Sequence, residues 1–246
     1  MTHAPGLLQT LSDALELGGL DLRAWGVAWA RVAPSIALVP AFGLRAIPGP
    51  ARIALGLAMA AGIAPALAPV AAGSMPWPAL LLVEAAKGLP VALTAAGALW
   101  AATMTGGVID NLRGGRERAD LPTVEQGGTP VGVLLSMLVA IAFLESGGPA
   151  RMAEALAAPG LAFHAPLARA AIDLAHGIEL AVAVAAPVLA ASIVVEVGGA
   201  LVARAASPAF IQPLLWPLRS IAILGVAAIV FNRIAGLLAM YAHSVP

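Results

Sequence analysis

The residues of this sequence that could do chemistry are charged side chains inside otherwise apolar stretches. Glu84 and Lys87 are three positions apart, so they can form an ion pair on one face of a helix. Charges are expensive in lipid and therefore usually face protein or water. We interpret this pair as self-neutralised, with a contact to a partner protein or a proton or ion relay as the alternatives.

Three further charges, Glu179, Glu196 and Arg233, lie in the last two apolar stretches. A Glu–Arg pair between these stretches, or across a subunit boundary, would hold an assembly together. His176 and Glu179 could share a helix face, but two lone groups do not make a metal site. We therefore predict that these side chains pair charges within an assembly and have no catalytic role.

The sequence lacks the motifs that are typical of enzymes. It has no glycine-rich phosphate loop ending in Lys-Ser or Lys-Thr, since its one lysine is Lys87, and no H-E-x-x-H or G-x-S-x-G pattern. It has no cysteine, which excludes disulfides and thiolate metal sites. We expect no catalytic residue, no metal and no cofactor. The zero net charge and the scattered basic residues do not indicate nucleic-acid binding.

A polar island at residues 106–129 interrupts the apolar sequence. It reads GGVIDNLRGGRERADLPTVEQGGT and contains seven charged residues and six glycines. Such a segment is either a solvated loop between membrane segments or a polar segment held inside protein or along an aqueous path. From the residues alone, both interpretations stay open.

Composition indicates the class of protein. The 246 residues are 61% hydrophobic and 11% charged, whereas a typical soluble domain is about 45–50% apolar and about 25% charged. This apolar surplus indicates an integral membrane or membrane-assembled protein. We expect one domain over residues 1–246. Residues 1–24 are predicted to be an amphipathic segment and not a signal peptide, because acidic residues interrupt the apolar run.

The positions of the apolar segments predict an all-α fold. Their approximate ranges are 26–42, 53–71, 79–105, 130–144, 174–202 and 218–241. Prolines inside most of them bend or split the helices, and the freed carbonyl groups need neighbouring helices as partners. We therefore expect an integral membrane-type protein of proline-broken helical hairpins. If all six segments cross the membrane, the basic residues in the loops place both termini outside.

Four stretches of the sequence, taken together, resemble one family. They are RVAPSIALVPAFGLRAIPGPAR at 31–52, GGVIDNLRGG at 106–115, TPVGVLLSMLVAIAFLESGG at 129–148 and RAASPAFIQPLLWPLRS at 204–220. In this order they are similar to the FliR/SctT family, the export-gate subunit of type III secretion systems. The second stretch is more similar to the injectisome branch, SctT, than to the flagellar branch, FliR. After it, RERADLPTVEQGG replaces the aspartate-proline segment usual in the family.

This resemblance implies a non-enzymatic, multi-pass subunit of a helical export-gate assembly in the bacterial inner membrane, partly above the membrane plane within the secretion base. The implied partners are SctR/FliP-like and SctS/FliQ-like gate subunits, an SctU/FlhB-like switch protein and the lipid bilayer. The implied substrate is an unfolded secreted polypeptide. A small-solute membrane transporter with broken helices is the alternative.

The resemblance also implies that the central loop is a plug in the closed pore. Glycine pairs would be its hinges, two apolar residues would exclude water, and an Asp–Arg pair would lock the closed state. The predicted plug and gating residues are Gly106, Gly107, Ile109, Asp110, Asn111, Leu112, Arg113, Gly114 and Gly115.

Overall fold

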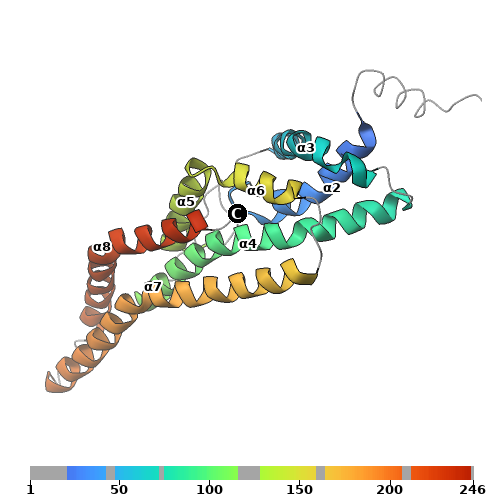
Figure 1. Cartoon of the computed structure of the whole chain (residues 1–246). Helices are drawn as coiled ribbons and strands as arrows, with labels where there is room; N and C mark the ends of the chain where they lie inside the picture. The colour runs from blue at the N-terminus through green and yellow to red at the C-terminus, as the bar shows by residue number, and fades with distance from the viewer. Residues whose placement is uncertain are drawn as a thin grey trace, which may run out of the picture.

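The computed structural model of the chain describes residues 21–42, 48–71, 75–115, 128–158, 164–206 and 212–244. Within these ranges the chain forms helices and no strand, so the predicted all-α class is confirmed (Figure 1). The helices are α2 (Leu22–Leu38), α3 (Gly49–Ala71), α4 (Trp77–Leu112), α5 (Pro130–Glu145), α6 (Gly148–Ala157), α7 (His164–Ala205) and α8 (Gln212–Ser244).

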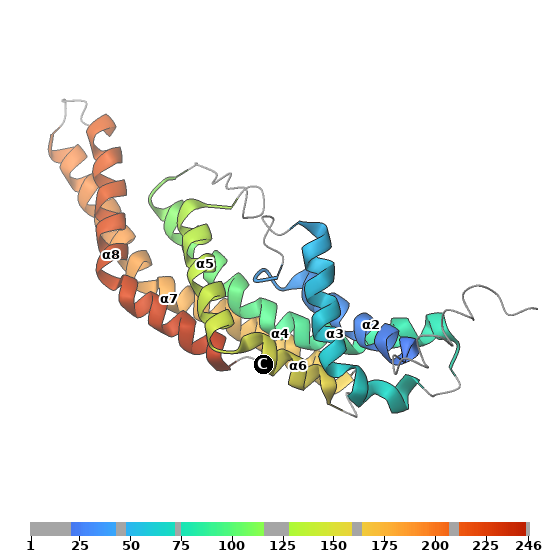
Figure 2. The same ribbon diagram turned by 90° about the horizontal axis from the view of Figure 1, so that it is seen from above.

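Helix α4 is the element on which most of the others pack. It contacts α2, α5, α6, α7 and α8, and in Figure 2 it runs between the end that holds α2 and α3 and the end that holds the α7–α8 turn. Small residues make up much of its buried surface, among them Ala92, Ala95, Ala96, Ala98, Ala101 and Ala102. Small side chains let neighbouring helices approach closely, so α4 can serve as a shared core.

Two glycines of α4 make the closest approaches to its neighbours. A Cβ atom on Gly88 would collide with the carbonyl oxygen of Arg31 in α2. One on Gly106 would collide with the backbone of Gly132 in α5. Because any other residue would force the backbones apart, these glycines fix where α2 and α5 cross α4.

Helices α7 and α8 form a long antiparallel hairpin that extends away from α2 and α3 (Figures 1 and 2). Near its turn Glu196 pairs with Arg219. Near its other end the Tyr241 hydroxyl donates to the Asp173 carbonyl oxygen at 2.8 Å. Pro187 and Pro217 lie inside the two helices, as the proline-broken hairpins predicted from the sequence require.

Four helices in the described part of the chain are long and apolar enough to cross a membrane. The stretches are Gly49–Leu67 in α3, the whole of α4, Ala170–Ala205 in α7 and Pro213–Tyr241 in α8. Helices α5 and α6 are bent by 64° and make a fifth only if they are taken as one span. The 17-residue α2 is not among them. The described residues thus offer four or five candidate crossings, so the condition for the orientation with both termini outside is not met.

Most of the predicted segments are present with longer ends. The third segment continues to Leu112, into the predicted polar island. The fifth begins at His164, before the predicted start at residue 174. The sequence HAP at 164–166 does not end the helix, because a proline is tolerated in its first turn. Of the predicted amphipathic segment 1–24, residues 1–20 lie outside the described residues. The Asp21 side chain caps α2 by accepting from the backbone amides of Arg23 and Ala24.

Candidate functional site

The first half of the predicted plug is helix and not loop. Residues 106–112 are the last turns of α4, and the connection to α5 begins at Arg113. The expected hinge at Gly106 is instead a close contact with α5, and Ile109 is 1% exposed within the core of the chain. The predicted loop at 106–129 is thus shorter than expected at its start. Residues 116–127 lie outside the described part.

Asp110 joins the end of α4 to the start of α5. Its Oδ1 accepts from Nε of Arg113 at 2.6 Å, and its Oδ2 accepts from the backbone amide of Val131 at 2.8 Å. The first amides of a helix lack partners within the helix, and Thr129 at the N-cap position makes no side-chain cap bond. Asp110 therefore caps α5 from α4, a role beyond the expected ion pair with Arg113.

A tight turn follows α4. Gly114 has a φ of 76°, which is the left-handed conformation that glycine adopts without strain. The amides of Gly114 and Gly115 donate to the carbonyl oxygens of Asn111 and Asp110 at 3.1 and 2.9 Å. Asn111 is exposed and Leu112 is partly buried. The second predicted glycine pair therefore ends the helix and turns the chain.

Arg219 connects the α7–α8 turn to the same end of α4. Its Nε donates to the carbonyl oxygen of Leu112 at 3.1 Å, and its Nη2 lies 2.5 Å from Oε1 of Glu196. The carbonyl groups in the last turn of a helix need donors, and a cation there is favoured by the helix dipole. Arg219 supplies both, although it was not predicted from the sequence as a site residue.

A Glu–Arg pair does join the last two helices, and its arginine is Arg219. Glu196 pairs with Arg219, because the antiparallel register sets these two residues opposite each other near the hairpin turn. Glu179 and Arg233 are both exposed and make no ion pair within the described ranges. Any pairing of these two across a subunit boundary remains a prediction.

A second polar group is buried where α2, α4 and α6 meet. Oε2 of Glu84 accepts from Nε of Arg31 at 2.8 Å and also from its Nη2. Oε1 of Glu84 accepts from Nζ of Lys87 at 2.7 Å. The Nη1 group of Arg31 donates to the carbonyl oxygen of Leu156 at 2.8 Å. The expected Glu84–Lys87 pair is present, but Arg31 was not predicted as its partner, although it is a charge inside the first apolar segment.

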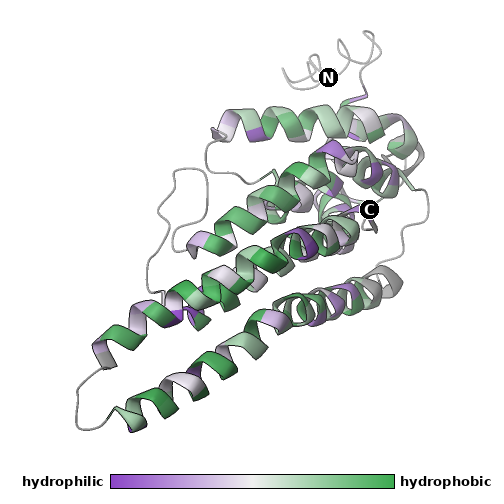
Figure 3. Cartoon of the chain, turned by 90° about the vertical axis from the view of Figure 1, so that its left-hand side faces the viewer, coloured by the Kyte–Doolittle hydropathy of each residue, from purple (hydrophilic) through white to green (hydrophobic). Residues whose placement is uncertain are grey.

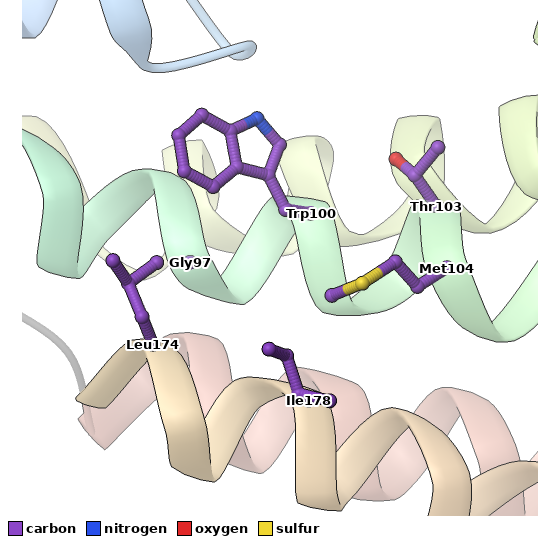
Figure 4. A pocket seen from close by; sticks show the side chains of 6 residues that line it. All are labelled: Gly97, Trp100, Thr103, Met104, Leu174 and Ile178. Carbon is purple, nitrogen blue, oxygen red and sulfur yellow. The ribbon is translucent and has the colours of Figure 1, made fainter. Parts of the chain in front are cut away.

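An apolar cavity of about 400 Å³ opens between α4 and α7. Leu174 and Ile178 rise from α7 towards α4, where Met104 lies along the facing side (Figure 4). Gly97, Trp100 and Thr103 complete the lining, which carries no charged side chain. In the described ranges no three His, Cys, Asp or Glu residues come together as metal ligands. The cavity therefore offers an apolar surface and no group that would orient a charged cofactor.

The family model described as "Bacterial export proteins, family 1" matches residues 22–244, a range that includes all the helices described above. No curated protein matches the sequence.

Proposed function

The chain belongs to the bacterial export proteins, family 1, and from this premise we propose that it is a subunit of a type III secretion export gate. With its four membrane-capable helices it is a multi-pass membrane protein of protein export. The finer proposal is that it forms and closes a channel for unfolded polypeptides in the bacterial inner membrane. The sequence of residues 106–115, GGVIDNLRGG, favours the injectisome branch of the family.

The observation that carries this proposal is the unpartnered surface of the α7–α8 hairpin. Of the 18-residue apolar window in each helix, only 28% in α7 and 17% in α8 is buried within the chain. Exposed apolar side chains follow both helices, among them Val182, Ile193, Val197, Leu201, Leu218, Ile221, Ile229 and Met240. Figure 3 shows the apolar colour along the long helices, interrupted by isolated hydrophilic residues. This surface requires a cover of lipid or protein.

Two charges on the hairpin favour protein as much of that cover. Glu179 and Arg233 are exposed among these apolar residues. A lipid environment accepts the apolar side chains but disfavours unpaired charges. We therefore propose neighbouring helical subunits of the SctR/FliP and SctS/FliQ type on this surface, with an SctU/FlhB-like switch protein as a further partner.

The closing element is proposed to lie in the connection from Arg113 to Thr129. Both of its ends are held: Asp110 links α4 to α5, and Arg219 binds the last carbonyl group of α4. Such fixed ends would keep the connection at one place across a pore. Within the predicted plug set, we assign Gly106, Ile109 and Asp110 to anchoring, and Arg113, Gly114 and Gly115 to the movable part.

Co-purification tests the proposal at the level of assembly. The tagged chain is co-expressed with SctR/FliP-like and SctS/FliQ-like subunits, and it is expected to purify as a complex with them. Alone in liposomes, it is expected not to take up small solutes. Failure to recover a complex, or saturable uptake by the single chain, would overturn the export-gate function in favour of the transporter.

Ion leakage tests the closing element separately. In liposomes that contain the complex, Arg113→Ala is expected to raise ion leakage while assembly is retained, because it frees the turn from Asp110. Arg204→Ala is the matched control, since Arg204 lies exposed at the end of α7 and makes no ion pair with a described residue. Equal leakage from the two variants would refute the role of the turn.

A further inference from the structure

The buried group around Glu84 holds one carboxylate and two cations. Arg31 occupies Oε2 and Lys87 occupies Oε1. Within the described residues neither cation has a second acidic partner. The group therefore carries one surplus positive charge, which no described residue neutralises.

The surplus charge is at the surface of the chain on the Lys87 side. Arg31 and Glu84 are 2% and 0% exposed, whereas the side chain of Lys87 is 25% exposed. Arg31 is turned inward, since it also donates to the carbonyl oxygen of Leu156. The ammonium group of Lys87 has three donors, and the bond to Glu84 uses one of them. Its remaining donors are available to a ligand from outside the chain.

The surroundings of Lys87 are those of an apolar interface. On the preceding turn of α4, Leu82 and Val83 are 73% and 39% exposed. Val83 precedes Lys87 by four residues and therefore lies on the same face of α4. A helix packed against this face would meet both side chains.

We propose that Lys87 is an ion-pair site between subunits and that it binds an aspartate or glutamate side chain on an adjacent export subunit. The partner surface is an apolar helix that covers Leu82 and Val83 and presents one carboxylate to the ammonium group. Arg31 and Glu84 are positioning residues that hold Nζ of Lys87 in place. The inference rests on the proposed function, because the carboxylate must come from another subunit of the assembly.

Zero-length cross-linking tests this contact directly, because Lys87 is the chain's one lysine. A carbodiimide adds to a carboxylate and forms an O-acylisourea. Nζ of Lys87 then attacks the acyl carbon, and the former carboxylate oxygen leaves with the carbodiimide as a urea. An amide bond forms with net loss of one water. Applied to the purified wild-type complex, the reaction is expected to join Lys87 to an Asp or Glu of another subunit, as read by peptide mass spectrometry. Links only to Glu84 or another acidic residue of the same chain, or no link, would overturn the inference.

Substitution of Lys87 gives an independent measurement. Lys87→Met removes the surplus charge and leaves the neutral Arg31–Glu84 pair, but Oε1 of Glu84 loses its donor, so a small fall in the unfolding temperature of the chain alone is expected. Recovery of the partner subunits is expected to fall at least about tenfold, since the partner's buried carboxylate loses its counter-charge. Lys87→Arg, which keeps the charge, is expected to retain most of the recovery.

The outcomes separate this inference from the proposed function. If the wild-type chain recovers no partner subunit, the export-gate function itself fails. If wild type and Lys87→Met recover the partners equally, only the ion-pair site is refuted. If Lys87→Met keeps its partners but loses co-purified anionic lipid, the ligand is a lipid phosphate and the inference is likewise overturned.

Discussion

Each end of the molecule contains a Glu–Arg ion pair, which is buried at one end and exposed at the other. Where α2, α4 and α6 meet, Arg31 and Glu84 are enclosed and tie distant parts of the chain together. At the α7–α8 turn, Glu196 and Arg219 are 52% and 38% exposed. A buried pair is strongly destabilising to break, whereas an exposed one contributes little. Breaking the pair at the first end is therefore expected to destabilise the chain, whereas breaking the pair at the hairpin turn is expected to have little effect.

The glycines show the same difference. Gly88 and Gly106 of α4 each touch the backbone of another helix. On the hairpin, a Cβ atom added to any of four glycines would meet nothing within 4 Å; these are Gly198, Gly199, Gly225 and Gly236. Close backbone contact is thus completed inside the chain along α4, whereas these hairpin glycines, like Gly62 in α3, stay open to a neighbour.

The largest expected effect is at Glu84. Glu84→Gln would leave Arg31 and Lys87 without a counter-charge, and we expect the free energy of unfolding to fall by about 3–5 kcal/mol. Thermal unfolding of the detergent-purified chain measures this. The double substitution Arg31→Met, Glu84→Met is expected to recover much of the loss, because it removes the fully buried guanidinium with the carboxylate and leaves only the partly exposed Lys87 without a counter-charge. A fully stable Glu84→Gln protein would contradict the distinction between the two ends.

Gly88→Ala is expected to have the next largest effect. Its new methyl group would collide with the Arg31 carbonyl oxygen and push α2 from α4, destabilising the chain by about 1–3 kcal/mol. Gly225→Ala on the hairpin is the matched control, and it is expected to stabilise the isolated chain by about 0.5–1 kcal/mol through helix propensity. Equal unfolding temperatures for the two variants would show that α2 and α4 can move apart at Gly88 without loss of stability.

The next prediction concerns Asp110, which joins α4 to α5 where the two ends of the molecule connect. Asp110→Ala removes the cap of α5 and the pair with Arg113, and we expect a loss of about 1 kcal/mol. Asp110→Asn keeps an acceptor for the Val131 amide and should lose less. Chemical denaturation of both variants measures the difference. An alanine variant no less stable than the asparagine variant would argue against the capping role.

The smallest effect is expected at the hairpin turn. Glu196→Gln should change the stability of the isolated chain by less than about 1 kcal/mol, because water and salt screen the exposed pair. Arg219→Met should be somewhat more harmful, since the Leu112 carbonyl oxygen also loses its donor. Unfolding at low and high salt distinguishes the two, and only the Glu196 contribution should fade with salt. A large, salt-independent loss in Glu196→Gln would mean that the hairpin is held from within.

Much of the fold could be predicted from the sequence because the relevant signals are local. The apolar segments, the interior prolines and the small residues follow from composition and order, and they indicated an all-α membrane-type protein. Helix ends were less predictable. Residues 106–112 contain paired glycines and charges, which alone favour a loop, yet they stay helical because Gly106 packs on Gly132 and Asp110 caps α5.

The sequence by itself determined the class of protein, the family resemblance and which side chains would need partners. An apolar composition and a charge inside an apolar helix have the same consequence in any arrangement of the helices. Only the tertiary structure decided who those partners are: Arg31 for Glu84, and Arg219 in place of Arg233 for Glu196. The physical reason is that an ion pair forms over a few ångströms, and only the packing and register of the helices bring residues far apart in the chain within that distance.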